Sequence, residues 1–342
     1  MSRIGIPSAR RRRLAPEGVE RRGKFGKQPV WNWYRSCGLT IRSQLELPEF
    51  FKIEPLSNAL DVVDIVIGNV PSTLKNGRTI TGWLQADDQK CLISSPNAAR
   101  YLVEDGARIT VDRRVQATHE TACVDGDVRA YLLGTVLGAL LHQREWLPLH
   151  ISAVKTDIGA VAFTGASGAG KSTLAAFLHY RLNFPLVSDD LAVLKPDDQQ
   201  PLLYPGPPRL KLWINAIEAL GVSPSGLTRD LTREDKFHLH RNLRFQHEPE
   251  RLTKLVVLTK GEEGRPTVIR RIRGIEAYRV FMQSIYRSNL RHLFSTQKRL
   301  HDIGGKIASK IEFYEYRRPW NLARLEQDLN QLCATLSLAT RG

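Results

Sequence analysis

FTGASGAGKSTLAAFL, residues 163–178, contains the pattern G-x-x-x-x-G-K-[ST] at positions 165–172. An apolar run at 160–163 precedes the pattern, and an alanine- and leucine-rich stretch with helical spacing follows it. These residues therefore predict three consecutive elements, which are a strand, a tight loop and a helix. Glycines let the backbone curl so that successive N–H groups point inward, and the helix adds the positive end of its dipole. The pattern is typical of a loop that binds the phosphates of a nucleotide.

The predicted ligands are ATP and Mg²⁺. Lys171 is expected to reach the β- and γ-phosphates, and Ser172 to offer a hydroxyl to Mg²⁺, which prefers oxygen ligands. An ordinary glycine-rich turn is the alternative, and the complete pattern in its strand–helix context disfavours it. The predicted nucleotide-binding residues are Gly165, Ala166, Ser167, Gly168, Ala169, Gly170, Lys171, Ser172 and Thr173.

Composition points to a folded chain that does not enter membranes. Of its 342 residues, 42% are hydrophobic and 25% charged, near the average for globular proteins, and the length allows two domains. No apolar run approaches the ~20 residues that span a bilayer, and the Arg-rich N-terminus lacks the apolar segment of a secretory signal. We therefore expect a cytoplasmic location and no membrane partner. The four cysteines, Cys37, Cys91, Cys123 and Cys333, are widely spaced and are expected to be small core residues.

The net charge of +15 is unevenly distributed. Residues 1–30 carry nine Arg and Lys against two Glu, a net +7, with few large apolar side chains, and we expect a flexible basic tail. Such a tail suits an acidic protein or peptide, a nucleic acid, or solubility alone. Nucleic acid is the partner that we do not expect.

Two folded regions are predicted after the tail. Short alternating segments punctuated by turn residues predict a smaller β-rich domain over residues 31–146, and its last part, 127–146, has the apolar spacing of a buried connecting helix. Residues 147–342 then form the catalytic domain around the loop. The segment 185–194 predicts a central strand, 276–294 a helix, and 196–250 shows no clear pattern.

Three acid–base residues flank the loop in sequence. Asp189 and Asp190 follow the helix within the apolar segment 185–194, and neighbouring side chains on a strand point to opposite faces unless the strand has begun to turn. One carboxylate can then face metal and phosphates while the other meets a different group. A solvated acidic strand end is the alternative. His150, on an apolar segment before the loop, is either a hydrogen-bonded core residue or a partner that keeps an aspartate ionised.

Together these motifs resemble a known family. His150, the loop 165–172, Arg181 and the run Ser188-Asp189-Asp190 are similar to the catalytic domain of bacterial HPr kinase/phosphorylase, which phosphorylates a protein serine. The resemblance implies an α/β fold with a P-loop core similar to phosphoenolpyruvate carboxykinase. Shorter segments (34–41, 45–49, 208–213 and 317–319) resemble HPr-kinase-related proteins that include serine kinases tailoring lasso-type ribosomal peptides. HPr kinases are hexamers, which leaves a homo-oligomer open.

The chain also departs from that family. Thr173 stands where HPr kinases have Glu after the loop serine, and a counterpart of their E-I-R-G-L-G segment, which supplies a metal-binding glutamate, is missing. The metal would then depend on Ser172 and Asp189. These departures argue against phosphorylase activity and against HPr itself as the substrate.

The resemblance implies an ATP-dependent serine kinase acting on a peptide or small protein, including a lasso-type precursor. Its catalytic residues would be His150, Lys171, Asp189 and Asp190, with Asp190 favoured as the base. Arg209, Lys211 and Lys236 are candidate substrate-binding cations, with a solvated basic loop as the alternative for each. The excess positive charge suits an acidic acceptor docked on residues 196–250. The alternatives are a kinase or carboxykinase-like transferase for small molecules, and a non-catalytic regulator that senses nucleotide or binds nucleic acid.

Overall fold

The computed structural model describes residues 30–339 apart from 57–58, 60, 96–97, 114–124, 231–232 and 240–242. The predicted basic tail and Cys123 lie outside these residues. Trp31–Gly342 form one compact unit, which is mixed α/β as predicted. A domain boundary at residue 147 stays a prediction. Within the described residues, every helix is too short or too polar to span a bilayer.

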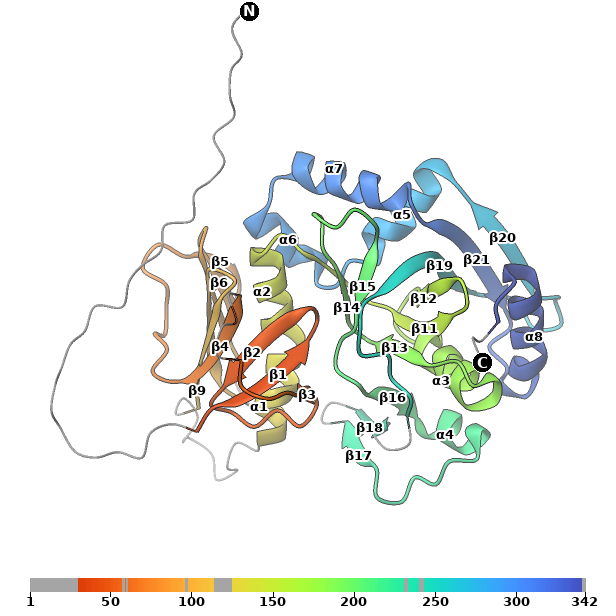
Figure 1. The fold of residues 1–342 in the computed structure, drawn as a ribbon, viewed down its shortest axis with the longest axis horizontal. Coiled ribbons are helices and arrows are strands. Elements are labelled where there is room, and N and C mark those ends of the chain that lie inside the picture. Colours follow the sequence, from red (N-terminus) through yellow and green to blue (C-terminus); the bar gives the residue numbers. More distant parts are fainter. Residues whose placement is uncertain are drawn as a thin grey trace, which may run out of the picture. The chain divides into compact units, whose positions relative to one another are not determined.

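The first part of this unit is a nine-stranded sheet in the order β3-β1-β2-β4-β9-β8-β7-β6-β5 (Figure 1). β2 and β9 run parallel to β4, and the other neighbours are antiparallel. Buried and partly exposed residues alternate along β2, as a sheet covered on one face requires. The strands are β1 (Asn32–Ser36), β2 (Leu39–Ser43), β3 (Phe51–Lys52), β4 (Val62–Ile67), β5 (Arg78–Thr81), β6 (Leu84–Ala86), β7 (Lys90–Ser94), β8 (Arg100–Glu104) and β9 (Arg108–Asp112). Cys37 and Cys91 are fully buried here, as predicted.

The connecting helix predicted over 127–146 is divided. It consists of α1 (Asp125–Tyr131), a π-helical turn η2 (Leu132–Val136) and α2 (Leu137–Gln143). Gly134 and Gly138 lie in and just after the turn, and a Cβ on either glycine would stand 3.3 Å from the side chain of Tyr286. The wider turn and the missing side chains therefore let Tyr286 approach the helix, and π-turns of this kind are frequent at functional sites.

A second nine-stranded sheet follows the helix. Its main path is β10-β14-β15-β19-β12-β11-β13, and β21 pairs with both β19 and β20. β12 is parallel to β19, which is parallel to β21. The strands are β10 (Leu147–Leu149), β11 (Ser152–Thr156), β12 (Gly159–Thr164), β13 (Leu186–Asp189), β14 (Ala192–Leu194), β15 (Leu202–Tyr204), β19 (Glu250–Lys260), β20 (Val268–Ile272) and β21 (Glu312–Arg318).

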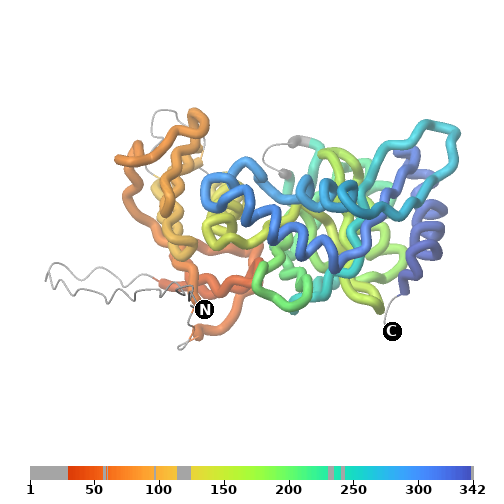
Figure 2. The backbone as a smooth tube through the Cα atoms, turned by 90° about the horizontal axis from the view of Figure 1, so that it is seen from above, coloured from red at the N-terminus to blue at the C-terminus, as the bar shows by residue number. Residues whose placement is uncertain are grey.

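Helices pack on both faces of this sheet. Val161 and Phe163 of β12 belong to a core shared with α3 (Lys171–Leu182) and α8 (Leu325–Leu336). Ala160 and Ala162 point the other way, into a core shared with α5 (Gly274–Gln283) and α7 (Gln297–Ala308). Figures 1 and 2 show α8, the last helix in dark blue, beside α3. This alternation buries β12 on both sides, and the loop follows the carboxyl end of this strand, which lies between β19 and β11.

Segments without a clear pattern gain structure from tertiary pairing. Residues 196–250 contain β16 (Leu210–Trp213), α4 (Ile214–Leu220), β17 (Thr228–Asp230) and β18 (Arg233–Leu239), which form a three-stranded sheet with one helix. The helix predicted over 276–294 is wrong as one element. It is interrupted between α5 and α6 (Ser288–Phe294), where Arg287 takes a left-handed φ of 49°.

Candidate active site

The strand, loop and helix predicted from residues 163–178 are present as β12, the segment 165–170 and α3. Gly165, Gly168 and Gly170 all have positive φ values, of 138°, 83° and 85°. A Cβ on Gly165 would stand 2.7 Å from the carbonyl oxygen of Leu258, so the loop lies against β19 with no room for a side chain. Glycine is thus required by both conformation and space, as in a loop whose amides approach a ligand closely.

Gly165→Ala should lower the free energy of unfolding by ~3 kcal/mol or more, because the methyl group adds a clash to the cost of positive φ. Gly221→Ala is the matched control. Gly221 also has a positive φ, of 73°, but nothing lies within 4 Å of its Cβ position, so a loss of only ~1 kcal/mol is expected. Urea denaturation of both variants makes the comparison. Equal losses would show that the close contact with Leu258 is not a constraint.

Lys171 begins α3 and is 7% exposed. Its Nζ donates to the carbonyl oxygens of Gly165 and Ala166, at 3.0 and 3.2 Å, and so closes the loop on itself. Burial lowers the pKa of this ammonium, Asp189 and Asp190 oppose the shift, and Lys236 adds to it. A desolvated ammonium held by loop carbonyls is positioned to exchange those oxygens for oxygens of an anion.

The adjacent aspartates are separated by a turn. The strand predicted over 185–194 ends at Asp189, Asp190 has a left-handed φ of 74°, and the chain continues as β14 with different strand neighbours. Asp189 is 2% exposed, whereas the side chain of Asp190 is 34% exposed. The interruption therefore buries one carboxylate and leaves the other accessible.

Asp189 is held by hydrogen bonds on both oxygens. Ser152 on β11, paired with Asp189 across the sheet, donates its hydroxyl at 2.6 Å, and the backbone amide of Lys211 donates at 2.9 Å. These contacts attach β13 to β11 and β16. Asp189 does not line the cavity described below. Its predicted role as a metal ligand stays a prediction.

Asp190 is surrounded by positive groups. Its Oδ1 lies 3.2 Å from Nδ1 of His150 and its Oδ2 lies 3.4 Å from Nζ of Lys211. Burial alone would raise the pKa of Asp190, but the hydrogen bond from His150 and the charges of Lys211, His150 and Arg209 outweigh it and hold the pKa well below the usual carboxyl range. Asp190 is therefore ionised at neutral pH.

His150 lies just before β11 and is fixed from several sides. Its backbone amide donates to the carbonyl oxygen of Ser284, and its ring lies 5.9 Å, centroid to centroid, from the ring of Tyr286. Nδ1 also lies 3.1 Å from the carbonyl oxygen of Asp190. Because a carbonyl oxygen only accepts hydrogen bonds, Nδ1 carries the proton that it shares between this oxygen and the carboxylate.

His150→Phe should raise the pKa of Asp190, because the variant keeps a ring beside Tyr286 but removes the hydrogen-bond donor and its charge. The titration of the Asp190 carboxyl carbon, followed by ¹³C NMR, measures the shift. The wild-type signal should not titrate near the ordinary carboxyl pKa of ~4, whereas the variant should move toward that value. His247→Phe, at an exposed histidine outside the cavity, should leave the signal unchanged. An unshifted signal in His150→Phe would contradict the assignment.

A cavity of about 1060 Å³ joins these groups. It is lined by the loop and helix residues from Ser167 to Thr173, and by His150 and Asp190. All three predicted substrate cations, Arg209, Lys211 and Lys236, also line it. Gly165 and Ala166 do not, although their carbonyls hold Lys171. Arg181 lies at the far end of α3, where it donates to the carbonyl oxygen of Ala219, outside the cavity.

Sequence reasoning missed several lining residues. Tyr286 and Arg287 come from the break between α5 and α6, Arg318 from the end of β21, and Tyr131 from the connecting helix. Arg318 belongs to the segment 317–319, which showed a family resemblance but carried no predicted role. No residue pattern around Arg287 predicted its positive φ. Ser152, also on the lining, has a signal that could have been used, since a polar residue on an otherwise apolar strand invites a search for its buried partner.

The loop fits a polyphosphate. Its residues from Ser167 to Gly170 line the cavity, and Lys171 and the start of α3 supply positive charge. The described residues include no cluster of three or more His, Cys, Asp or Glu side chains able to hold a metal alone. A Mg²⁺ ion here would share phosphate oxygens with Ser172, which is the usual manner of Mg²⁺ beside nucleotides.

Comparisons with known proteins find similar solved structures. No family model matches this chain. No curated protein sequence matches it either. Among the solved structures that it matches is the Hpr(Ser) kinase/phosphatase from Coxiella burnetii, with 14% identical residues, 56% of this chain and 97% of the other covered, and a TM-score of 0.28. A TM-score of this size defines neither the fold family nor the chemistry, so the function has to be inferred from the cavity itself.

Proposed function

We propose that this protein is an ATP-dependent kinase that transfers the γ-phosphoryl group to a serine hydroxyl of a peptide or small protein. The observation that carries the proposal is that an ionised, accessible carboxylate, Asp190, lines the same cavity as the loop 167–170 and Lys171. Transfer to an alcohol needs a phosphate cradle and a proton acceptor together. A nucleotide sensor without transfer activity needs only the cradle.

ATP with Mg²⁺ would supply the phosphoryl group and neutralise the charge on its oxygens. The amides at the start of α3 and Lys171 would bind the phosphates, and Ser172 would hold the metal. Asp190 would orient the acceptor hydroxyl and take its proton. A carboxylate with so low a pKa is a weak base, which is sufficient where the transition state is loose and the proton leaves late. His150 and Lys211 keep this carboxylate ionised and oriented.

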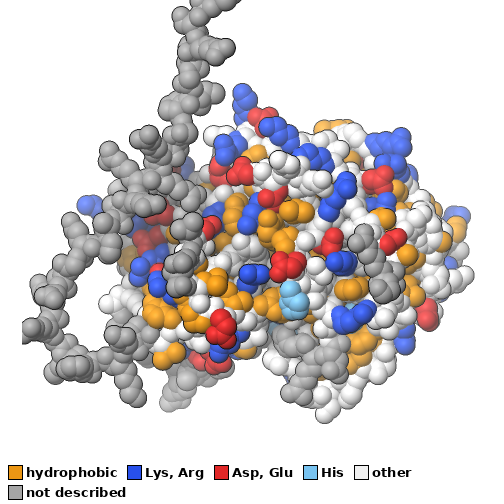
Figure 3. Space-filling model, viewed as in Figure 1, with side chains coloured by type: hydrophobic (Ala, Val, Ile, Leu, Met, Phe, Trp, Pro, Cys, Tyr) orange, Lys and Arg blue, Asp and Glu red, His pale blue; other side chains and the backbone are white. Residues whose placement is uncertain are grey.

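An acidic acceptor fits the distribution of charge. Residues 274–308, which span α5, α6 and α7, carry six Arg and Lys against two acidic residues, a net +4, whereas residues 196–250 carry seven against eight. The docking surface is therefore better placed on α5, α6 and α7 than on the loops 196–250. The turn between α5 and α6 adjoins the cavity through Tyr286 and Arg287, and Lys and Arg side chains gather over α7 in Figure 3. Exposed positions include Arg273, Arg279, Lys298 and Lys306.

The test incubates the full chain with ATP, Mg²⁺ and serine peptides that differ only in acidic residues. A mass increase of one phosphate on the peptide, greater for acidic peptides and reduced by salt, is expected. Serine→alanine peptides are the control for the acceptor atom. Phosphate transfer to a small alcohol but to no peptide would favour the small-molecule alternative. Nucleotide binding with no transfer to any acceptor would favour the sensor. A homo-oligomer and a cytoplasmic location stay predictions.

A further inference from the structure

Arg318, the last residue of β21, is a buried cation beside the loop. It is 4% exposed, lines the cavity, and its Nη2 would stand 3.4 Å from a Cβ placed on Gly170. Gly170 is the N-cap of α3, where backbone N–H groups point out of the helix. The guanidinium is thus at the positive end of the helix, near the buried Lys171.

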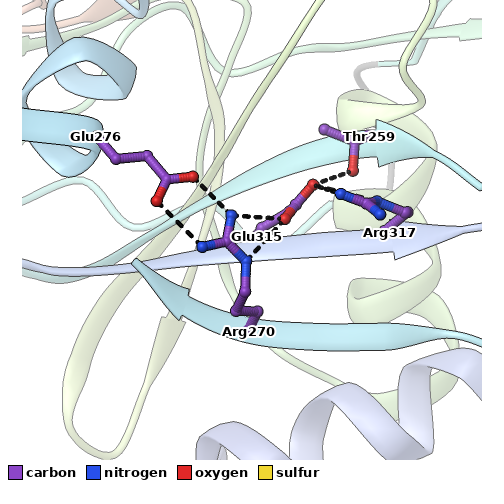
Figure 4. A network of polar contacts seen from close by, with 5 residues as sticks. All are labelled: Thr259, Arg270, Glu276, Glu315 and Arg317. Carbon is purple, nitrogen blue, oxygen red and sulfur yellow. Dashed lines mark hydrogen bonds and ion pairs between the residues drawn. The ribbon is translucent and has the colours of Figure 1, made fainter. Parts of the chain in front are cut away.

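No carboxylate forms an ion pair within 4 Å of Arg318 among the residues that the structure describes, although the buried Asp328 acts on it electrostatically from farther away. Its Nη1 donates to the carbonyl oxygen of Pro319 at 3.1 Å, and its Cζ lies 6.0 Å from the centre of the Tyr316 ring. Arg317, the preceding residue, contrasts with it. Arg317 is 53% exposed, and its Nη2 lies 2.8 Å from Oε1 of Glu315 (Figure 4). Because successive strand residues point to opposite faces, one arginine joins an ion-pair network and its neighbour faces the loop.

The surroundings of Arg318 favour an anion. Burial disfavours an unpaired guanidinium, and the N-terminus of α3 repels it further. Burial lowers the pKa of this side chain, and Tyr316 and Asp328 oppose the shift only in part. A phosphate group would relieve both effects, since it accepts the two parallel hydrogen bonds of a guanidinium and carries the opposite charge.

We infer that Arg318 is a second polyphosphate-binding residue, which grips the phosphates from the end of β21 while Lys171 and α3 hold them from the loop. The inference rests on the proposed function, because it names a further residue of the same nucleotide site. Arg318 would then contribute to the binding of ATP and ADP, but little to the binding of AMP or adenosine. The guanidinium would supply part of the positive charge that transferring phosphoryl groups require.

The test is calorimetric binding of ATP, ADP and inorganic tripolyphosphate to the full chain and to the variants R318Q, R318K and R317Q. R318Q should weaken the binding of ATP and of tripolyphosphate ~30-fold or more. R318K should weaken it several-fold, because an ammonium keeps the charge but cannot donate the two parallel hydrogen bonds of a guanidinium. R317Q should remain within ~2-fold of the wild type, since rim charges contribute little. If R318Q does not fold, the binding measured with R318K tests the inference instead. Wild-type affinity of R318K for ATP and tripolyphosphate would then overturn the inference.

Thermal unfolding separates binding from a structural role. Without ligand, R318Q should melt at or above the wild-type temperature, because an unpaired buried charge has been removed. Tripolyphosphate should raise the wild-type melting temperature but not that of R318Q. A lower melting temperature with unchanged binding would assign Arg318 to structure and overturn the inference. Wild-type binding in R318Q together with lost binding in Lys171→Ala would overturn it while leaving the proposed function intact. If the wild type itself binds no ATP, both are wrong.

Discussion

Asp190→Asn is expected to lower the rate of phosphoryl transfer by ~10²- to 10⁴-fold while ATP affinity changes little. The amide has the shape of the carboxylate, and its oxygen still accepts the hydrogen bond from Nδ1 of His150, although its nitrogen no longer pairs with Lys211. It cannot take a proton from the acceptor hydroxyl. Single-turnover transfer to the best acidic peptide, with ATP affinity measured in parallel by calorimetry, gives both quantities.

The control for this variant is Asp88→Asn, at an exposed aspartate in the turn before β7 that does not line the cavity. It should leave both the rate and the affinity unchanged. Full transfer by Asp190→Asn would exclude Asp190 as the base. A slow rate accompanied by a large loss of ATP affinity would instead assign Asp190 to nucleotide binding.

Lys171→Ala should weaken the affinity for ATP at least ~30-fold and abolish measurable phosphoryl transfer, because it removes a buried charge-assisted contact to phosphate. The variant also frees the carbonyl oxygens of Gly165 and Ala166, so the loop should become more mobile. Affinity is measured by calorimetry with ATP and with ADP. Unchanged affinity for both would contradict the phosphate cradle itself.

Lys195→Ala is the matched control for the lysine. Lys195 is also partly buried, its Nζ lies 4.1 Å from the centre of the Tyr204 ring, and it donates to the carbonyl oxygen of Gly38, outside the cavity. Its replacement should reduce stability without changing ATP affinity. A similar loss of affinity in both variants would indicate a general effect of removing a buried cation.

Several features of the candidate site follow from local sequence. The glycines of the loop adopt the positive φ values that the pattern anticipates, and Lys171 lies at the start of the predicted helix. His150 contacts Asp190, one of the two aspartates that it was expected to orient. The cations Arg209, Lys211 and Lys236 line the cavity although residues 196–250 showed no clear pattern. In that segment the positive charge of single residues was more informative than periodicity.

The sequence by itself determined the strand, loop and helix around Lys171, because glycine conformations, helix spacing and strand apolarity act over a few neighbouring residues. Only the tertiary structure decided that Asp190 reaches the cavity while Asp189 is buried against Ser152. The reason is that the chain takes a left-handed turn at Asp190, between β13 and β14, and these two strands pair with different strands of the sheet. The tertiary structure also decided that Arg318 and Tyr286, distant in the chain, lie beside the loop. Such placements depend on the order of strands in the sheet and on which faces are packed, and neither is encoded within one short segment.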